Sequence, residues 1–164
     1  MTAQTTQPAS LPWLEKLIAI PTVSGTSNLE LIELIEAEFA RYGYSGVRTY
    51  NEDRTRANLL VTIPAADGTT RGGVILSGHT DVVPVAGQAW DADPFTLRVE
   101  GTRAYGRGVC DMKGFLAVAL WLLPRVAEAK LRTPLHFAFS YDCLLYTSDA
   151  ADERTSLDLG GRRI

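Results

Sequence analysis

Residues 74–84 read VILSGHTDVVP, and this stretch decides the fold that we predict. It begins with apolar, partly β-branched residues of the length and type of a buried strand, and it then changes to small and polar residues that include His79 and Asp81. A neutral imidazole nitrogen can bind a divalent metal, and a carboxylate two residues further on can accept the other ring N–H and fix the tautomer. We therefore expect chemistry at the end of a strand.

A second stretch, YGRGVCDMKGF at residues 105–115, contains Asp111, whose anionic oxygens can bridge two cations. Gly106 and Gly108 do not form a dinucleotide-binding loop, because the third glycine is absent and no first buried strand of a βαβ unit precedes them. Cys110 has no identifiable partner histidine, so we expect a small packed residue and not a nucleophile. The other histidine, His136, lies mid-strand without a carboxylate neighbour, which favours a structural role.

The hydrophobic pattern of the rest of the chain predicts helices that alternate with strands. One helix is expected over residues 11–19 with Ser10 as its cap, a second from a Ser27–Glu30 capping box to Gly43, and a third over residues 115–123 that Pro124 ends or kinks. Strands are expected over residues 47–50, 58–63, 74–76, 96–100, 103–105 and 135–140. This order predicts an α/β fold with a partly parallel mixed sheet flanked by helices, in which ligands gather at the carboxyl ends of strands.

Composition narrows the class of protein. The 164 residues carry a formal net charge of -3, which gives no basic face for nucleic acid. Two cysteines cannot make a disulfide framework, and residues 1–10 lack the basic start and apolar run of a secretory signal. No apolar stretch approaches membrane-spanning length. The expectation is therefore a cytoplasmic protein that binds neither nucleic acid nor membrane.

Three motifs resemble those of a known enzyme family and occur in the order in which that family has them. They are LSGHTDVVPV at residues 76–85, WDADPF at residues 90–95 and the YGRGVCDMKGF stretch. Together they resemble the zinc-dependent deacylases and metallopeptidases that include acetylornithine deacetylase, succinyl-diaminopimelate desuccinylase and carboxypeptidase G. Within that family, the sequence is most similar to the acetylornithine deacetylases, especially in DPFTL at residues 93–97, GRGVCDMKGF at residues 106–115 and PLHFAFSYD at residues 134–142. The resemblance covers about residues 11–142.

This resemblance implies the N-terminal part of a di-metal hydrolase catalytic domain, with two Zn²⁺ in a complete site and Co²⁺ as a possible substitute. It implies that His79 ligates one metal, that Asp111 bridges both, and that Asp81 is the catalytic residue that orients His79. The resemblance further implies that the enzyme acts on an N-acyl amino acid and cleaves N-acetyl-L-ornithine to L-ornithine and acetate in arginine biosynthesis. It also implies that the parent enzyme is a homodimer. No substrate-binding residue is assigned. A sister deacylase for a succinylated or other N-acyl amino acid and a noncatalytic metal-binding or structural fragment are the alternatives.

The chain departs from the family pattern directly after Asp142. The family has two consecutive glutamates there, a general base and a metal ligand, whereas this chain has Cys143 and Leu144. Residues 143–153, CLLYTSDAADE, resemble a translated sequencing adapter. We therefore expect residues 1–142 to form the catalytic-domain part and residues 143–164 to be an unrelated, disordered or artefactual tail. The strand at residues 135–140 would then lack its usual neighbours.

Overall fold

Four strands form a mixed sheet in the order β1-β2-β6-β3, in which β1, β2 and β6 pair antiparallel and β3 pairs parallel to β6. The computed structural model describes residues 7–144. The strands of this sheet are β1 (Gly46–Tyr50), β2 (Ala57–Ile63), β3 (Val74–His79) and β6 (Leu135–Ser140), and the helices are α1 (Leu11–Ile18), α2 (Leu29–Ala40) and α3 (Gly114–Glu128). A separate hairpin, β4 (Arg98–Glu100) and β5 (Arg103–Tyr105), leads into an irregular helical turn, η1 (Val109–Lys113). The predicted α/β fold with a partly parallel sheet is confirmed.

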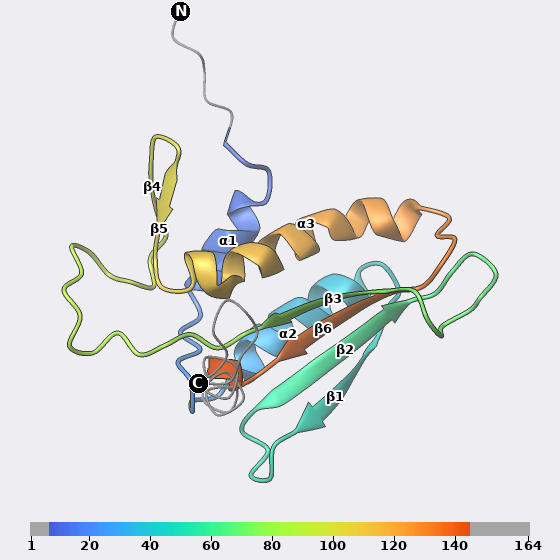
Figure 1. Ribbon diagram of the computed structural model, residues 1–164, viewed down its shortest axis with the longest axis horizontal. Coiled ribbons are helices and arrows are strands. Elements are labelled where there is room, and N and C mark those ends of the chain that lie inside the picture. Colours follow the sequence, from blue (N-terminus) through green and yellow to red (C-terminus); the bar gives the residue numbers. More distant parts are fainter. Residues whose placement is uncertain (1–6, 145–164) are drawn as a thin grey trace, which may run out of the picture.

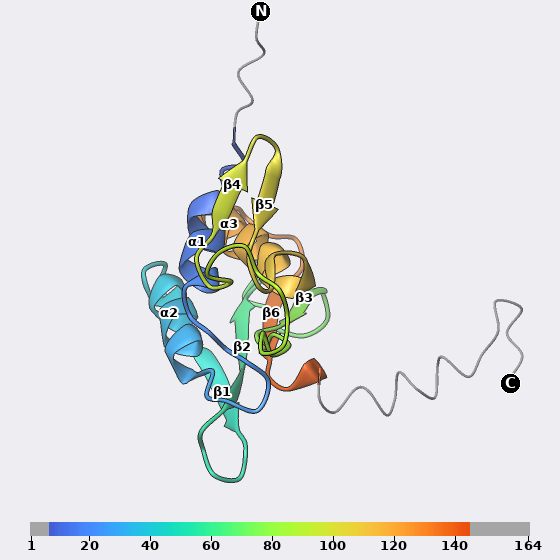
Figure 2. The same ribbon diagram turned by 90° about the vertical axis from the view of Figure 1, so that its left-hand side faces the viewer.

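All three helices lie on one side of this sheet (Figures 1 and 2). The strand β2 alternates buried and less buried residues, and its buried set, Ala57, Leu59, Val61 and Ile63, faces the helices together with Phe137 and Phe139 of β6. From α2, the ring of Phe39 meets those of Phe137 and Phe139 edge-on at centroid distances of 5.0 and 6.3 Å. The core therefore lies between this face and the helices, as the apolar stripe of α2 predicts.

The N-terminal ends of two helices differ from the prediction. Ser10 makes no side-chain capping bond to α1, and the N-cap of α2 is Asn28, so the Ser27–Glu30 capping box is wrong. The side chain of Asn28 instead bonds to the backbone of Ala57 in both directions, at 2.9 Å each. The Asn28 side chain therefore bonds to β2 and does not cap α2.

Pro124 does not end α3, which continues to Glu128. A proline inside a helix removes one backbone hydrogen bond. On both sides of it, Leu120, Leu123 and Val126 are buried in the core. Because the apolar burial of these side chains extends past the proline, packing outweighs the lost hydrogen bond.

The strand β6 lies inside the sheet, so the prediction that residues 135–140 lack neighbours is wrong. Its residues pair with β2 on one side and with β3 on the other, where Phe137 lies between Val61 and Leu76. In the described part of the chain, β3 is at the edge, and Val74 and Ile75 are 54% and 60% exposed. The prediction of a buried strand at residues 74–76 is therefore also wrong.

Parallel pairing of β3 and β6 brings their carboxyl ends together, and His79 pairs with Ser140. At Gly78 a Cβ atom would lie 2.7 Å from the side chain of Leu116, so glycine allows α3 to approach this end of β3 closely. None of the helices in residues 7–144 is long and apolar enough to cross a membrane. The predictions for the tail beyond Leu144 fall outside the described residues.

Candidate metal centre

The imidazole of His79 lies between two carboxylates at the carboxyl end of β3. Its Nε2 is 2.8 Å from Oδ1 of Asp111, and its Nδ1 is 3.2 Å from Oδ1 and 2.9 Å from the main-chain oxygen of Asp81. His79 and Asp81 are buried, whereas the side chain of Asp111 is 68% exposed. The structure thus brings the three predicted site residues together, with one open carboxylate facing solvent.

The hydrogen bonds between His79 and Asp81 favour the charged form of each side chain. The hydrogen bond to Asp81, with a further contribution from Asp111, raises the pKa of His79 to about 9 against the opposing effect of burial. Burial opposes ionisation of Asp81, but hydrogen bonds from His79 and Ser24 outweigh it and lower the pKa of that carboxyl. The two carboxylates therefore favour a positive charge at the imidazole of His79.

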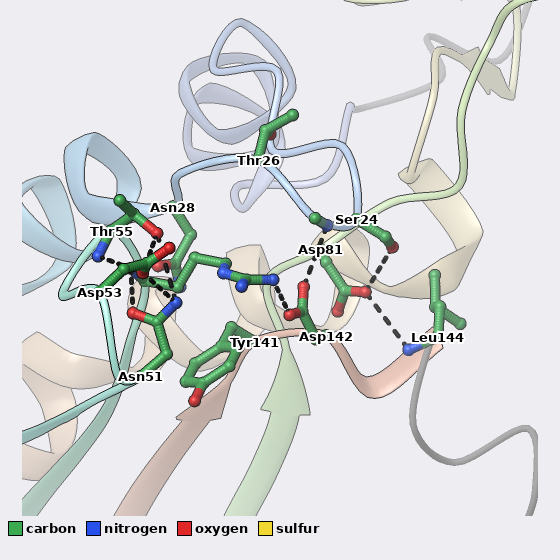
Figure 3. A network of polar contacts seen from close by, with 12 residues as sticks. Ser24, Thr26, Asn28, Asn51, Asp53, Thr55, Asp81, Tyr141, Asp142 and Leu144 are labelled. Carbon is green, nitrogen blue, oxygen red and sulfur yellow. Dashed lines mark hydrogen bonds and ion pairs between the residues drawn. The ribbon is translucent and has the colours of Figure 1, made fainter.

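Asp81 receives three further hydrogen bonds from other parts of the chain. The Ser24 hydroxyl donates to Oδ2 at 2.6 Å, and the backbone N–H of Leu144 donates to the same oxygen at 3.3 Å (Figure 3). The backbone N–H of Cys143 donates to Oδ1 at 3.2 Å. Ser24 lies in the loop between α1 and α2, 57 residues from Asp81 in the sequence. No local pattern could have identified this serine.

Asp142 joins the loop between α1 and α2 to the end of β6. Its hydrogen bonds in the described part of the chain go to Gly25 and Arg56 and not to His79. Its Oδ1 accepts from the backbone N–H of Gly25 at 3.1 Å, and its Oδ2 accepts from the guanidinium of Arg56 (Figure 3). Asp142 is 2% exposed, and the Arg56 guanidinium also lies 5.6 Å from the ring centre of Tyr141. No local sequence pattern indicates a role for Arg56, because its partner Asp142 lies 86 residues further along the chain.

A hydroxyl and amide network fixes the strand ends that bear the site. Thr80 donates from its hydroxyl to the Ser140 carbonyl at 2.8 Å and accepts from the Asn28 amide at 3.0 Å. The Thr22 hydroxyl donates to the Thr80 carbonyl at 2.5 Å. Because Thr80 immediately follows His79, these bonds hold the β3 end in register with β6.

The donor atoms suit zinc but do not complete a zinc site. Imidazole nitrogen and carboxylate oxygen are common zinc ligands, and catalytic sites usually have three from the protein. Among residues 7–144, no group of three or more His, Cys, Asp or Glu side chains is arranged to hold a metal ion. Leu144, beside Asp81, has no donor side chain where the resemblance implies a glutamate ligand. His79 and Asp111 therefore fit as two ligands of a larger set.

A cavity of about 290 Å³ opens next to Asp111. Its lining includes Val83, Trp90, Tyr105, Arg107, Asp111 and Leu144. Cys110 also lines it and is exposed, so the prediction of a packed cysteine is wrong: η1 turns this side chain outward from the core. A space of this size beside Asp111 suits a small molecule.

His136 is held away from the site, as predicted. Its Nδ1 is 2.8 Å from the Thr62 hydroxyl, and its Nε2 is 2.8 Å from the Gly72 carbonyl. Both ring nitrogens thus have partners on the sheet and the preceding loop, which confirms the structural role.

Comparison with known proteins indicates the class of protein. Residues 75–142 match the profile described as Peptidase family M20/M25/M40. The chain is 38% identical over 148 residues to the acetylornithine deacetylase of Salmonella paratyphi B, a match that covers 86% of this chain and 35% of the relative. The chain thus spans about a third of the length of the curated relatives it matches.

Solved structures show the same fold at low identity. Human carnosine dipeptidase 1 is similar with a TM-score of 0.66 and 18% identity, over 88% of this chain and 35% of that protein. A Zn-dependent exopeptidase from Parabacteroides distasonis gives a TM-score of 0.55 and 15% identity, over 79% of this chain and 44% of that protein. The resemblance predicted from the sequence motifs is confirmed at the level of family and fold.

Proposed function

We propose that this chain supplies the first part of the active site of a metal-dependent hydrolase that cleaves N-acetyl-L-ornithine to L-ornithine and acetate. The observation that supports it most is the buried imidazole of His79, held between Asp81 and the open carboxylate of Asp111. The 38% identity to acetylornithine deacetylases favours this substrate over a succinylated or other N-acyl amino acid.

The proposed ions are two Zn²⁺ in the complete site, with Co²⁺ as a substitute. When bound, they polarise the amide carbonyl and lower the pKa of a bound water. His79 would offer Nε2 and Asp111 its carboxylate, as a ligand to both ions. Asp81 would accept a hydrogen bond from Nδ1–H, which would leave the lone pair of Nε2 free for a metal ion. The zinc dependence of the Parabacteroides exopeptidase supports this choice of metal.

The setting we propose is arginine biosynthesis in the cytoplasm, in a homodimeric parent enzyme with a small-molecule substrate and no nucleic-acid or membrane partner. The cavity beside Asp111 has room for an N-acyl amino acid.

The chain as given should not turn over this substrate. Cys143 and Leu144 stand where the family resemblance implies a general base and a metal ligand. Positioned general-base catalysis contributes roughly 10²- to 10⁴-fold, and the loss of a metal ligand adds to that deficit. For this chain alone, a noncatalytic role is therefore favoured.

A chimera tests the proposal. Residues 1–142 are joined to the part of the Salmonella acetylornithine deacetylase that follows the position aligned with Asp142, and ornithine release is measured with zinc or cobalt. We expect turnover of N-acetylornithine that His79→Ala and Asp111→Asn abolish, while the unmodified chain stays at background. A well-folded chimera that prefers N-succinyl-diaminopimelate would overturn the substrate assignment, and full activity of the His79→Ala chimera would overturn the site.

A further inference from the structure

The orientation of the Asp81 carboxylate depends on a residue from the N-terminal part of the chain. Its Oδ1 lies 3.2 Å from Nδ1 of His79. Its Oδ2 accepts from the Ser24 hydroxyl at 2.6 Å, which is shorter than the 3.3 Å bond from the Leu144 N–H to the same oxygen (Figure 3). A carboxylate bonded at both oxygens cannot rotate without breaking one of these bonds. Ser24 therefore fixes which oxygen Asp81 presents to the histidine.

Ser24 is itself held in place by the backbone. Its N–H donates to the Val82 carbonyl at 2.9 Å, the Val82 N–H donates to the Thr22 carbonyl at 2.9 Å, and Val23 and Val82 form a parallel bridge. Gly25, which follows, has φ 86° and donates its N–H to Asp142. Because this φ favours glycine, the sequence Ser-Gly suits the turn that directs the hydroxyl at Asp81.

We propose that Ser24 is a positioning residue for the metal centre, acting through Asp81 on His79. This inference rests on the proposed function, since it concerns the same site. Residues that orient a ligating histidine typically change metal affinity or activity 10- to 100-fold when mutated. Ser24 acts one bond further out, so we expect the lower end of that range.

Zinc affinity of the complete 164-residue chain, measured by calorimetry at constant pH, tests this inference. Ser24→Ala should weaken zinc binding about tenfold. Ser24→Thr, which keeps the hydroxyl, should bind zinc within about twofold of the unmodified chain, a difference of about 0.4 kcal/mol or less. The matched control is Ser27→Ala in the same loop, whose hydroxyl accepts from the Leu29 N–H and does not contact Asp81; its affinity should be unchanged.

A double-mutant cycle separates positioning from a general effect on folding. If Ser24 acts through Asp81, Ser24→Ala should cause no further loss of zinc affinity in the Asp81→Asn background. Equal losses in the two backgrounds would overturn the inference. Thermal unfolding of each variant checks the fold, and Ser24→Cys, with a weak donor of similar size, replaces Ser24→Ala if the latter does not unfold cooperatively.

The variant His79→Ala shows which claim has failed. Zinc binding that survives His79→Ala would overturn both the proposed metal site and the role of Ser24. Zinc binding that His79→Ala abolishes but Ser24→Ala leaves unchanged would overturn the role of Ser24 alone.

Discussion

The ammonium group of Lys113 lies 2.8 Å from the main-chain oxygen of Leu17, at the carboxyl end of α1. It also donates to the Ile20 carbonyl at 2.7 Å, and the side chain is fully buried. Burial lowers the pKa of Lys113 to about 8. Because Lys113 follows Asp111 by two residues, this contact ties the segment that bears the exposed carboxylate to the first helix.

Replacement of Lys113 by methionine should destabilise the chain. The variant keeps much of the apolar stem but leaves the carbonyls of Leu17 and Ile20 without this donor. A buried carbonyl without its hydrogen bond costs about 1–3 kcal/mol, so the free energy of unfolding in urea should fall by at least that amount. Lys130→Met, at an exposed lysine, is the control. Equal stability of the two variants would contradict this prediction.

The ion pair between buried Asp142 and half-buried Arg56 should contribute more than a surface ion pair. Removing one partner of a fully buried pair leaves the other charge uncompensated, at a cost of about 3–5 kcal/mol. Because Arg56 keeps some contact with solvent, Asp142→Ala should lower the free energy of unfolding by about 1–3 kcal/mol, as measured by urea denaturation. Asp91→Ala, at an exposed aspartate, should change it little. A loss below about 1 kcal/mol would place the pair with exposed ion pairs.

The stability of the metal-free chain should depend on pH through His79. Its pKa is about 9 in the fold, against an ordinary value of 6.5. Because the folded state binds this proton more tightly, the stabilisation is complete below pH 6.5 and is lost as the pH rises through about 9. Urea unfolding at about pH 6 and about pH 9.5 should thus show a larger stability loss for the unmodified chain than for His79→Gln. A parallel pH dependence in both proteins would refute the assignment.

A carboxylate at position 144 should strengthen zinc binding. The Leu144 N–H is 3.3 Å from Oδ2 of Asp81, so a side chain at this position starts beside the metal centre. Affinity grows with the number of preorganised ligands, and we expect Leu144→Glu to bind zinc at least about tenfold more tightly than the unmodified chain. A competition titration with a chromophoric chelator measures this. Leu144→Gln, which lacks the charge, should gain less, and an equal gain would argue against ligation.

Local patterns predicted much of this structure because strands and turns depend on nearby residues. The strands at residues 103–105 and 135–140 have the predicted bounds, and the change from apolar to polar residues at His79 located the cluster of His79, Asp81 and Asp111 that we propose as a metal centre. The prediction failed where distant residues decide the outcome. The apolar run at residues 74–76 gave no sign that β3 lies at an edge, and Ser24 gave no local sign of its contact with Asp81.

The position of β6 between β2 and β3 has a consequence for the order of folding. Phe137 pairs with both Val61 and Leu76, so neither of these strands can complete its place in the sheet until the chain beyond residue 134 has been synthesised. Closing loops of this length is entropically costly and slows folding. His79 is translated long before Ser140, its partner in the sheet. We therefore expect His79, the proposed metal ligand, to reach its final position only after β6 has been synthesised and has paired with β3.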